Sequence, residues 1–350
     1  MPKISAVTTA VPAHRIDQPA AREFARNFFS KRTPDINRLL PLFENAGIET
    51  RYFSAPPEWF EVPHTLEEKN LLYIESATTL AATAARQLFD ETGLRPEQID
   101  YIIYVNTTGL ATPSIDARLI NVLGLRPDIR RTPVWGLGCA GGAAGLAHAY
   151  HHALGHPDQR ILVVAAELCG LTFLADDFSR SNLVATALFG EGAAAALVTG
   201  DSVQTAGLEI LGTRSRFYPD SLDVMGWSVV SSGLQVVFAQ RIPAIVEANA
   251  ALDFGAFLAD YDLGLPDVDR FLIHPGGTKV IEAYESALNL TNGHMDLARG
   301  VLRDYGNMSS VTVLFVLERY IRQYGFDRGG YGLISALGPG FCSESLLLNL

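Results

Sequence analysis

The chain has 350 residues, 48% of them hydrophobic and 19% charged, and a net charge of −11. This size and composition predict a well-packed globule of one large or two medium domains and exclude a disordered chain. The negative charge excludes a nucleic-acid surface, because binding to phosphates needs clustered Lys and Arg. Three cysteines without a CxxC pair predict neither a disulfide framework nor a zinc site.

The sequence has no signal-peptide pattern at its N-terminus, and no run of about 18 uncharged apolar residues that would predict a membrane span. Together with the odd number of cysteines, this predicts a cytoplasmic protein. Four histidines lie at helical spacings late in one predicted helix, and we interpret them as a solvated helix end because no carboxylates join them as metal ligands. They are His148, His151, His152 and His156.

Apolar strands and helices alternate along the first half of the chain. The predicted strands are Lys3–Val11, Ile99–Val105, Arg160–Glu167 and Ala193–Val198. The predicted helices are Ala20–Phe29, Glu75–Thr92, Ile115–Leu123 and Cys139–Ala153. This alternation predicts an α/β fold in which helices cover the sheets.

The second half of the chain repeats part of this pattern. The segment Asp100-Tyr-Ile-Ile-Tyr-Val-Asn matches Asp269-Arg-Phe-Leu-Ile-His, and the loop and helix at Cys139 match those at Asn307. The two spacings agree, at 39 and 38 positions. A repeat of this length is too long for a solenoid unit. It predicts a duplicated domain with a pseudo-twofold axis that brings the two loops to a common centre.

The join between the two halves is predicted in the polar stretch Thr199–Ala206. It divides the chain into an N-terminal half, residues 1–203, and a C-terminal half, residues 204–350. The first half carries a candidate nucleophile, and the second carries a His and an Asn that could assist it.

That nucleophile is Cys139, which is flanked by glycines and followed by a helix of small residues. A helix N-terminus and a nearby imidazole, from His274, would stabilise its thiolate. Taken alone, the cysteine could be a core residue, the histidine a turn former, and Asn307 a helix cap. The motifs are Trp135-Gly-Leu-Gly-Cys-Ala-Gly-Gly142, Phe271-Leu-Ile-His-Pro-Gly-Gly277 and Tyr305-Gly-Asn-Met-Ser-Ser310.

Five short motifs in one order give the chain its family resemblance. They are Gly138-Cys-Ala-Gly-Gly, Leu188-Phe-Gly-Glu-Gly-Ala-Ala-Ala, Ile273-His-Pro-Gly-Gly, Gly306-Asn-Met-Ser-Ser and Gly338-Pro-Gly-Phe. Over nearly its whole length the chain resembles the type III polyketide synthases, the chalcone-synthase-like branch of the thiolase superfamily. The stretches from Asn106 to Arg118 and from Trp135 to Gly142 resemble bacterial members that make long-chain alkylpyrones.

The resemblance implies a thiolase-like five-layered αβαβα sandwich, a homodimer, and no cofactor beyond the substrates acyl-CoA and malonyl-CoA. The implied reaction is decarboxylative condensation of malonyl-CoA onto an acyl starter held on Cys139, followed by cyclisation. His274 and Asn307 would donate hydrogen bonds to the enolate oxygen, and such donors are worth about 3 kcal/mol each. Decarboxylation makes the carbanion without a base, so no Asp or Glu is expected in the triad.

The resemblance also implies a substrate cavity. Phe189 matches one of two gate phenylalanines, and Val236 falls at the second after a one-residue insertion. Because Val removes bulk and stays apolar, we expect a longer or aliphatic starter. The other matched cavity positions are Thr172, Cys169, Gly226, Ser309 and, from a partner subunit, Thr112. Cys169 and Thr112 both differ from plant members, which weakens any prediction of plant-like aromatic specificity.

Binding of CoA is less clearly marked in the sequence. Arg38 matches one position of a basic cluster that holds the CoA phosphates in plant members, whereas Pro41 and Asn45 occupy the other two. The sequence leaves three alternatives open. The CoA phosphates bind more weakly, other residues bind them, or the enzyme accepts acyl groups from an acyl carrier protein.

The leading hypothesis is a synthase that extends a fatty acyl-CoA with malonyl-CoA to alkylpyrone-type triketides or tetraketides. The alternatives are a ketoacyl-ACP synthase III-like enzyme that stops after one extension, an alkylresorcinol-forming type III synthase, and an inert acyl-binding relative.

Overall fold

The computed structural model describes residues 1–291 and 293–350. The helices are α1 (Gln18–Phe29), α2 (Pro41–Asn45), α3 (Leu66–Thr92), α4 (Ile115–Leu123), α5 (Gly141–Gly155), α6 (Arg180–Leu188), α7 (Ile242–Ala259), α8 (Thr278–Leu288), α9 (Asp296–Tyr305) and α10 (Thr312–Tyr324). The strands are β1 (Lys3–Ala10), β2 (His14–Asp17), β3 (Thr50–Phe53), β4 (Tyr101–Asn106), β5 (Arg130–Trp135), β6 (Arg160–Leu168), β7 (Glu191–Thr199), β8 (Leu208–Phe217), β9 (Met225–Val230), β10 (Gly233–Phe238), β11 (Val268–Ile273), β12 (Tyr331–Gly338) and β13 (Cys342–Asn349).

Nine strands pair in the order β11-β12-β13-β8-β1-β7-β6-β4-β5. Outward from the junction of β1 and β8, the two halves repeat one arrangement: β1-β7-β6-β4 on one side and β8-β13-β12-β11 on the other. In each half the first two pairings are antiparallel and the third is parallel. The halves meet where Lys3 pairs with Glu209 and Ile4 with Leu208. This symmetry is the predicted duplication, and β5 is an additional strand of the N-terminal half.

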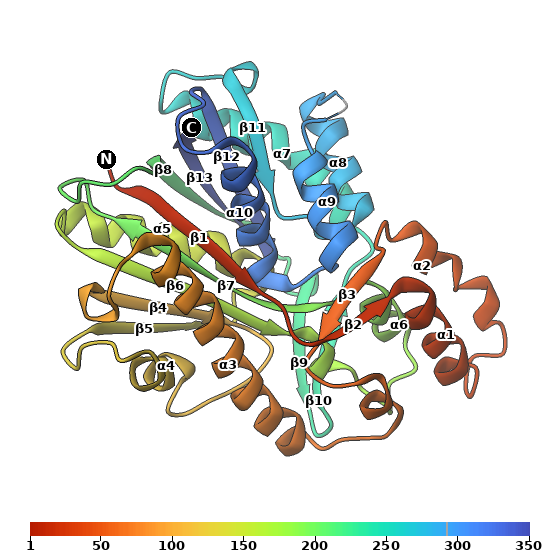
Figure 1. The fold of residues 1–350 in the computed structure, drawn as a ribbon. Helices are drawn as coiled ribbons and strands as arrows, with labels where there is room; N and C mark the ends of the chain where they lie inside the picture. Colours follow the sequence, from red (N-terminus) through yellow and green to blue (C-terminus); the bar gives the residue numbers. More distant parts are fainter. Residues whose placement is uncertain (292) are drawn as a thin grey trace.

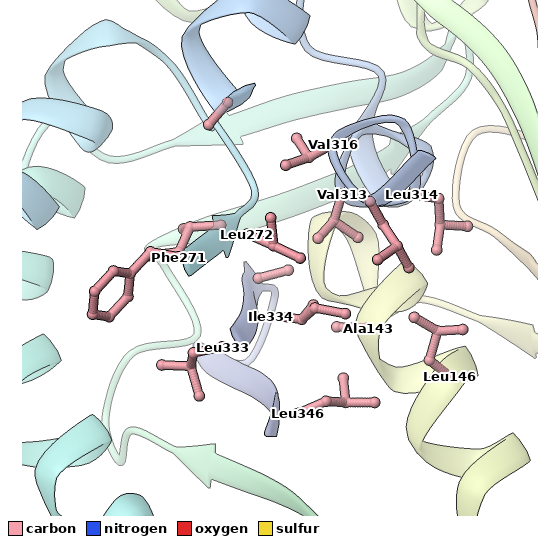
Figure 2. Close-up of a cluster of buried hydrophobic side chains, with 14 of the residues drawn as sticks. Ala143, Leu146, Phe271, Leu272, Val313, Leu314, Val316, Leu333, Ile334 and Leu346 are labelled. Atoms are coloured by element: carbon pink, nitrogen blue, oxygen red, sulfur yellow. The ribbon is translucent and has the colours of Figure 1, made fainter. Parts of the chain in front are cut away.

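Helices alternate with the two half-sheets to give the predicted five-layered α/β sandwich. α3 and α4 cover the outer face of the N-terminal half-sheet. α5 and α10 lie between the half-sheets, and α7 and α8 cover the outer face of the C-terminal one (Figure 1). Figure 2 shows Val313 and Leu314 of α10 near Ala143 and Leu146 of α5, with Ile334 of β12 beside them. The shared apolar core therefore fixes the starts of the two central helices, where the candidate loops lie.

α3 begins nine residues before the predicted start at Glu75. Thr65 caps its N-terminus, accepting a hydrogen bond from the Glu68 N–H, while the Glu68 carboxylate accepts one from the Thr65 N–H. This reciprocal capping satisfies two main-chain donors and is worth about 1 kcal/mol. By contrast, α4 has the predicted bounds, Ile115–Leu123.

One helix of the described residues, α7, is long and apolar enough to resemble a membrane span, with a mean hydropathy of 1.4. It carries Asp253, whose carboxylate accepts a hydrogen bond from the Tyr218 hydroxyl. Its buried side chains, among them Phe254 and Phe257, join the main apolar core. These contacts are those of a core helix of the sandwich.

A side lobe outside the sandwich consists of α1, α2, α6 and the two-stranded sheets β2–β3 and β9–β10 (Figure 1). Aromatic rings hold it together: Phe28 lies 5.0 Å from Phe173 and 5.3 Å from Phe178 between ring centroids. The side lobe covers the end of the sandwich at which the candidate loops emerge.

Candidate active site

Cys139 lies in a single 3₁₀ turn, Gly138–Ala140, that runs directly into the N-terminus of α5, as the sequence predicted. The flanking glycines are needed for close packing. A Cβ on Gly142 would lie 2.2 Å from the Ser310 carbonyl oxygen, and one on Gly138 would lie 2.5 Å from Pro339. Gly138 also has a φ of +49°, which favours glycine. The cysteine loop can thus approach the segment that contains Asn307.

Asn307 connects the three candidate residues. The Cys139 Sγ lies 3.9 Å from the Asn307 Oδ1 and 3.7 Å from the Ser309 Oγ. The Ser309 N–H donates to the Asn307 Oδ1 at 2.8 Å, and the Asn307 Nδ2 donates to the Gly276 carbonyl at 3.1 Å. Gly276 belongs to the turn that follows His274, so the amide bridges the cysteine loop and the histidine loop.

His274 follows the end of β11, where its N–H donates to the Ser335 carbonyl at 2.8 Å. Its side chain is buried, and neither ring nitrogen has a hydrogen-bond partner among the described residues. Buried polar atoms in native proteins are nearly always paired. Two unpaired ring nitrogens beside the Asn307 loop are therefore suited to a polar group that a substrate brings.

Burial sets the charge states of this site. It raises the pKa of the Cys139 thiol to about 12 and lowers the pKa of the His274 imidazole to about 3. A hydrogen bond with Ser309 lowers the pKa of the thiol, but this effect is smaller than that of burial. The sequence predicted a thiolate, whereas burial alone favours a neutral thiol and a neutral imidazole.

The cavity beside Cys139 is small, about 20 Å³, and Phe189, Gly226, Val236 and Ser309 all line it. It has room for about one water molecule. The expected gain of space at Val236 is absent, because Trp227 and Phe238 of the β9–β10 hairpin pack against the same wall.

Comparison with known proteins agrees with this geometry. The N-terminal domain of the chalcone and stilbene synthases matches residues 2–202, and the C-terminal domain matches residues 209–350. The chain belongs to the chalcone and stilbene synthase family. It is a type III polyketide synthase, and thus an acyltransferase that condenses malonyl-CoA.

Individual relatives cover the whole chain. A protein of Bacillus subtilis (strain 168) named putative chalcone synthase is 40% identical over 99% of this chain and 98% of its own length. The 1,3,6,8-tetrahydroxynaphthalene synthase of Streptomyces peucetius subsp. caesius is 38% identical over 99% and 92%. The crystal structure of the 1,3,6,8-tetrahydroxynaphthalene synthase of Streptomyces coelicolor A3(2), a bacterial type III polyketide synthase, superimposes with a TM-score of 0.94 at 29% identity, covering 99% of both chains.

The remaining predicted site residues of the synthase lie in different surroundings. Cys169 and Thr172 are buried in a 3₁₀ turn after β6, where the Thr172 hydroxyl donates to the Cys169 carbonyl at 2.7 Å. Thr112 is exposed on the single chain, so its contribution to a partner's cavity stays a prediction. Arg38 is exposed on the side lobe and lies 3.7 Å from the Asp35 carboxylate.

Sequence reasoning missed a buried carboxyl group under the candidate loops. Glu167, at the end of β6, accepts hydrogen bonds from the Thr107 N–H at 2.9 Å, the Thr108 hydroxyl at 2.8 Å and the Ser310 hydroxyl at 2.6 Å. The Thr107 hydroxyl in turn accepts from the Gly138 N–H at 3.0 Å. Burial raises the pKa of Glu167 to about 7. The available signal was an acidic residue inside an otherwise apolar strand.

A buried arginine was missed as well. Arg51 of β3 donates to the main-chain carbonyls of Thr186, at 2.6 Å, and Phe189, at 3.0 Å, and to the Gln18 side chain at 2.9 Å. Its stem also packs against Gly306, where a Cβ would lie 2.8 Å from it. Burial lowers the pKa of Arg51 to about 9, so it stays charged at neutral pH. Arg51 therefore holds the segment at Phe189 beside the loop of Asn307.

Proposed function

We propose that the synthase extends a fatty acyl-CoA starter with two or three malonyl-CoA units to give alkylpyrone-type triketides or tetraketides, with Cys139, His274 and Asn307 as its catalytic triad. The observation that carries the triad is the convergence of the thiol, the Asn307 amide and the histidine loop within a buried site of a condensing-enzyme fold.

The first step loads the starter. The Cys139 sulfur attacks the thioester carbonyl of the acyl-CoA, a new C–S bond forms, and the bond to the CoA sulfur breaks. The thiol proton leaves with CoA as CoA–SH. The N–H groups of the glycine-flanked loop are suited to stabilising the tetrahedral oxyanion because no side chains block access to them.

Forming the nucleophile requires the thiol proton to move to His274. Burial disfavours each charge alone, but a thiolate and an imidazolium attract strongly at low dielectric and offset that cost. The N-terminus of α5 adds a favourable field for the negative charge. We therefore propose a thiolate–imidazolium pair as the reactive form, in equilibrium with the neutral pair that burial favours.

The second step makes the carbon–carbon bond. Malonyl-CoA loses CO₂, and the electron pair of the broken C–C bond becomes an enolate whose charge lies on the thioester oxygen. The Asn307 Nδ2 and an unpaired ring nitrogen of His274 would donate to that oxygen. The enolate carbon then attacks the acyl group on Cys139, and the thiolate leaves. The product is a β-ketoacyl-CoA that is two carbons longer than the acyl group on Cys139. For the next cycle the Cys139 sulfur attacks its thioester carbonyl, and CoA–SH leaves as in the first step.

An aliphatic starter is supported by the wall of Cys169, Phe189 and Val236, which pack together as one apolar cluster. Closure of the triketide by oxygen attack would give a pyrone, and an aldol closure would give a resorcinol. Tetrahydroxynaphthalene and phloroglucinol synthases among the relatives are named for aromatic products, so an aromatic ring closed through a carbon–carbon bond is the main alternative product. A single-extension condensing enzyme is the other alternative.

For the substrate carriers, we propose acyl-CoA and malonyl-CoA, with Arg38 as one contact to the CoA phosphates and an acyl carrier protein as the alternative donor. We further propose a homodimer in which Thr112 reaches the partner's cavity, and a cytoplasmic enzyme whose three cysteines, all free, stay reduced. The division into residues 1–203 and 204–350 stays our proposal for the two halves.

The test is incubation with malonyl-CoA and a panel of acyl-CoAs from acetyl to eicosanoyl, read by mass spectrometry. Triketide and tetraketide pyrones with a fatty acyl optimum are the expected result. Products extended only once would favour the single-extension enzyme, and resorcinols would favour the aldol branch.

A further inference from the structure

The carbonyl groups that end α6 all have hydrogen-bond donors, most of them from distant parts of the chain. A helix leaves its last four carbonyls without partners inside the helix, so other groups must supply the donors. The Phe189 N–H donates to the Ala185 carbonyl at 2.9 Å, and the Asn307 N–H donates to the Leu188 carbonyl at 2.8 Å. Side chains from outside α6 bind the two carbonyls between these.

Those side chains are Arg51 of β3 and Gln18 of α1. Arg51 Nη1 donates to the Thr186 carbonyl at 2.6 Å and to the Phe189 carbonyl, just past the helix, at 3.0 Å. Gln18 Nε2 donates to the Ala187 carbonyl at 3.0 Å, and Gln18 Oε1 accepts from Arg51 Nη2 at 2.9 Å. The helix dipole favours a cation at this end. The guanidinium thus holds the end of α6 with donors in a fixed fork.

The end of α6 in turn holds the main chain of Asn307. Besides the bond from Asn307 to Leu188, the Gly190 N–H donates to the Asn307 carbonyl at 2.9 Å. Phe189 and Asn307 therefore form an isolated parallel bridge outside the nine-stranded sheet. The peptide groups on both sides of the Asn307 side chain depend on where the end of α6 lies.

Arg51 also packs against the loop that leads to Asn307. At Gly306, which has a φ of +71°, a Cβ would lie 2.8 Å from the Arg51 Cδ. The start of β3 is attached to the end of α9, because the Thr50 hydroxyl donates to the Asp304 carbonyl at 2.7 Å. Arg51 therefore lies between the ends of α6 and α9, the two segments that meet at Asn307.

The guanidinium of Arg51 has no carboxylate partner among the described residues, although the residue is only 1% exposed. A buried cation without a counter-ion is costly, and an apolar side chain would avoid that cost. What an apolar side chain could not do is bind Thr186, Phe189 and Gln18 together in one arrangement. The buried charge therefore points to a requirement for precise geometry at this place.

We propose that Arg51 is a positioning residue for the decarboxylation of malonyl-CoA, because it fixes the end of α6 that holds Asn307. The proposal rests on the proposed role of Asn307 as a donor to the enolate oxygen. It does not extend to Cys139, whose loop is held elsewhere: the Gly138 N–H donates to the Thr107 hydroxyl at 3.0 Å. A shift of about 1 Å in a reacting group can cost 10²-fold in rate, so a small movement of the amide should be measurable.

The test separates decarboxylation from loading. Arg51→Met keeps an unbranched side chain but removes every donor, and we expect release of CO₂ from malonyl-CoA to fall about 10- to 100-fold. Loading of Cys139 from butanoyl-CoA, followed by intact-protein mass spectrometry, should fall much less. An equal loss in both steps would overturn the proposal, because general damage to the fold would lower them together.

The control removes another buried cation near the side lobe. Lys69 donates to the Phe173 carbonyl at 2.8 Å and to the Ser232 carbonyl at 3.1 Å, and neither belongs to the segment that holds Asn307. Lys69→Met should therefore leave the ratio of decarboxylation to loading as in the wild type. A ratio that falls as far in Lys69→Met as in Arg51→Met would also overturn the proposal.

A double variant tests whether Arg51 acts through Asn307. Because Asn307→Ala already removes the amide, adding Arg51→Met should lower decarboxylation by less than about twofold further. The same loss from Arg51→Met in both backgrounds would show that Arg51 acts independently of Asn307, and would overturn the proposal. Wild-type decarboxylation in Asn307→Ala would instead remove the proposed role of Asn307, and that of Arg51 with it.

Arg51→Lys separates geometry from charge, and it carries the test if Arg51→Met does not fold. An ammonium group keeps the charge but cannot bind three acceptors in the arrangement of a guanidinium. We therefore expect a smaller loss of decarboxylation than in Arg51→Met, again with loading largely spared. Decarboxylation at the wild-type rate in Arg51→Lys would assign the effect to charge and overturn the proposal.

Discussion

The two loops that meet at the active site come from equivalent places in the duplicated halves, yet they carry different chemistry. In the N-terminal half, a 3₁₀ turn with Cys139 leads into α5. In the C-terminal half, Asn307 precedes a 3₁₀ turn that leads into α10. Each loop has a glycine of positive φ directly before the candidate residue: Gly138 at +49° and Gly306 at +71°. Two related loops, each leading through a 3₁₀ turn into a central helix, thus present a thiol and an amide to the same space.

The two loops differ in the residues that allow their close packing. Gly142, which follows the cysteine loop, has no side chain at the point where the Ser310 carbonyl approaches it. A Cβ at this position would collide with the Ser310 carbonyl oxygen. In the asparagine loop, Ser309 keeps its side chain beside the Cys139 sulfur although its φ is +50°. The duplication therefore brings the two loops together, while local differences place the proposed nucleophile in one half and the proposed hydrogen-bond donors in the other.

Replacing the nucleophile should have the largest effect. Cys139→Ala removes the only sulfur proposed to carry the acyl chain, and we expect product formation to fall about 10⁴-fold or more. The measurement is steady-state release of CoA from the starter, with circular dichroism to confirm folding. Cys342→Ser, at a half-buried cysteine on β13, is the matched control and should keep its turnover. Turnover in Cys139→Ala near the wild-type rate would exclude covalent catalysis at this thiol.

Replacing the amide should separate the roles of the two loops. We expect Asn307→Ala to reduce decarboxylation of malonyl-CoA by 10²- to 10³-fold, about the loss found when one oxyanion donor is removed. Loading of Cys139, followed by intact-protein mass spectrometry, should fall much less. Equal losses in both steps would mean that Asn307 supports the loop instead of the enolate.

The pH dependence of Cys139 tests the proposed ion pair. Without the imidazole, burial keeps the pKa of the thiol raised, so in His274→Ala the thiolate should form only as the pH rises well above 9. In the wild type, transfer of the proton to His274 should allow alkylation by iodoacetamide near neutral pH, at a rate at least 10-fold higher than in the variant. Identical rate-against-pH curves for the two proteins would show that His274 does not activate the thiol.

The smallest effect concerns the buried carboxyl group that connects the loops. Because burial raises the folded-state pKa of Glu167 to about 7, the folded protein holds this proton more tightly than the unfolded chain. Stability from this group is present below pH 4.5 and is lost as the pH rises to 7, by up to about 3 kcal/mol. Chemical denaturation at pH 5 and pH 8 should therefore show a smaller loss in Glu167→Gln than in the wild type. The exposed control Glu58→Gln should behave as the wild type, and an equal loss in Glu167→Gln would contradict the assignment.

Local signals in the sequence were sufficient for the α/β fold class and the two repeated loops, whereas the five-layered sandwich was implied by the family resemblance. The bounds of α4 and the matched spacings of Cys139 and Asn307 follow from periodicity, glycines and a repeat. The contacts of Glu167 and Arg51 could not be derived this way, because their partners Ser310 and Phe189 lie more than 130 positions away. The hydrogen-bond partners of a buried charged residue can be identified only in the folded structure.

The room available at position 236 also depends on contacts that the sequence does not show. A Val at position 236 suggested room at the gate, but Trp227 faces it across the β9–β10 hairpin and fills that side. The larger apolar space lies beyond Phe189, where α1 and α6 meet. How neighbours repack around a smaller residue depends on tertiary contacts that a single position does not specify.

The central claim is that Cys139 carries the growing chain between the two loops. Its most direct test is peptide mapping by mass spectrometry after brief mixing with octanoyl-CoA, with and without malonyl-CoA. We expect an octanoyl thioester on the peptide that contains Cys139, and we expect it to disappear as polyketide products form once malonyl-CoA is added. An acyl group found instead on Cys169 or Cys342, or products formed while Cys139 stays unmodified, would contradict it.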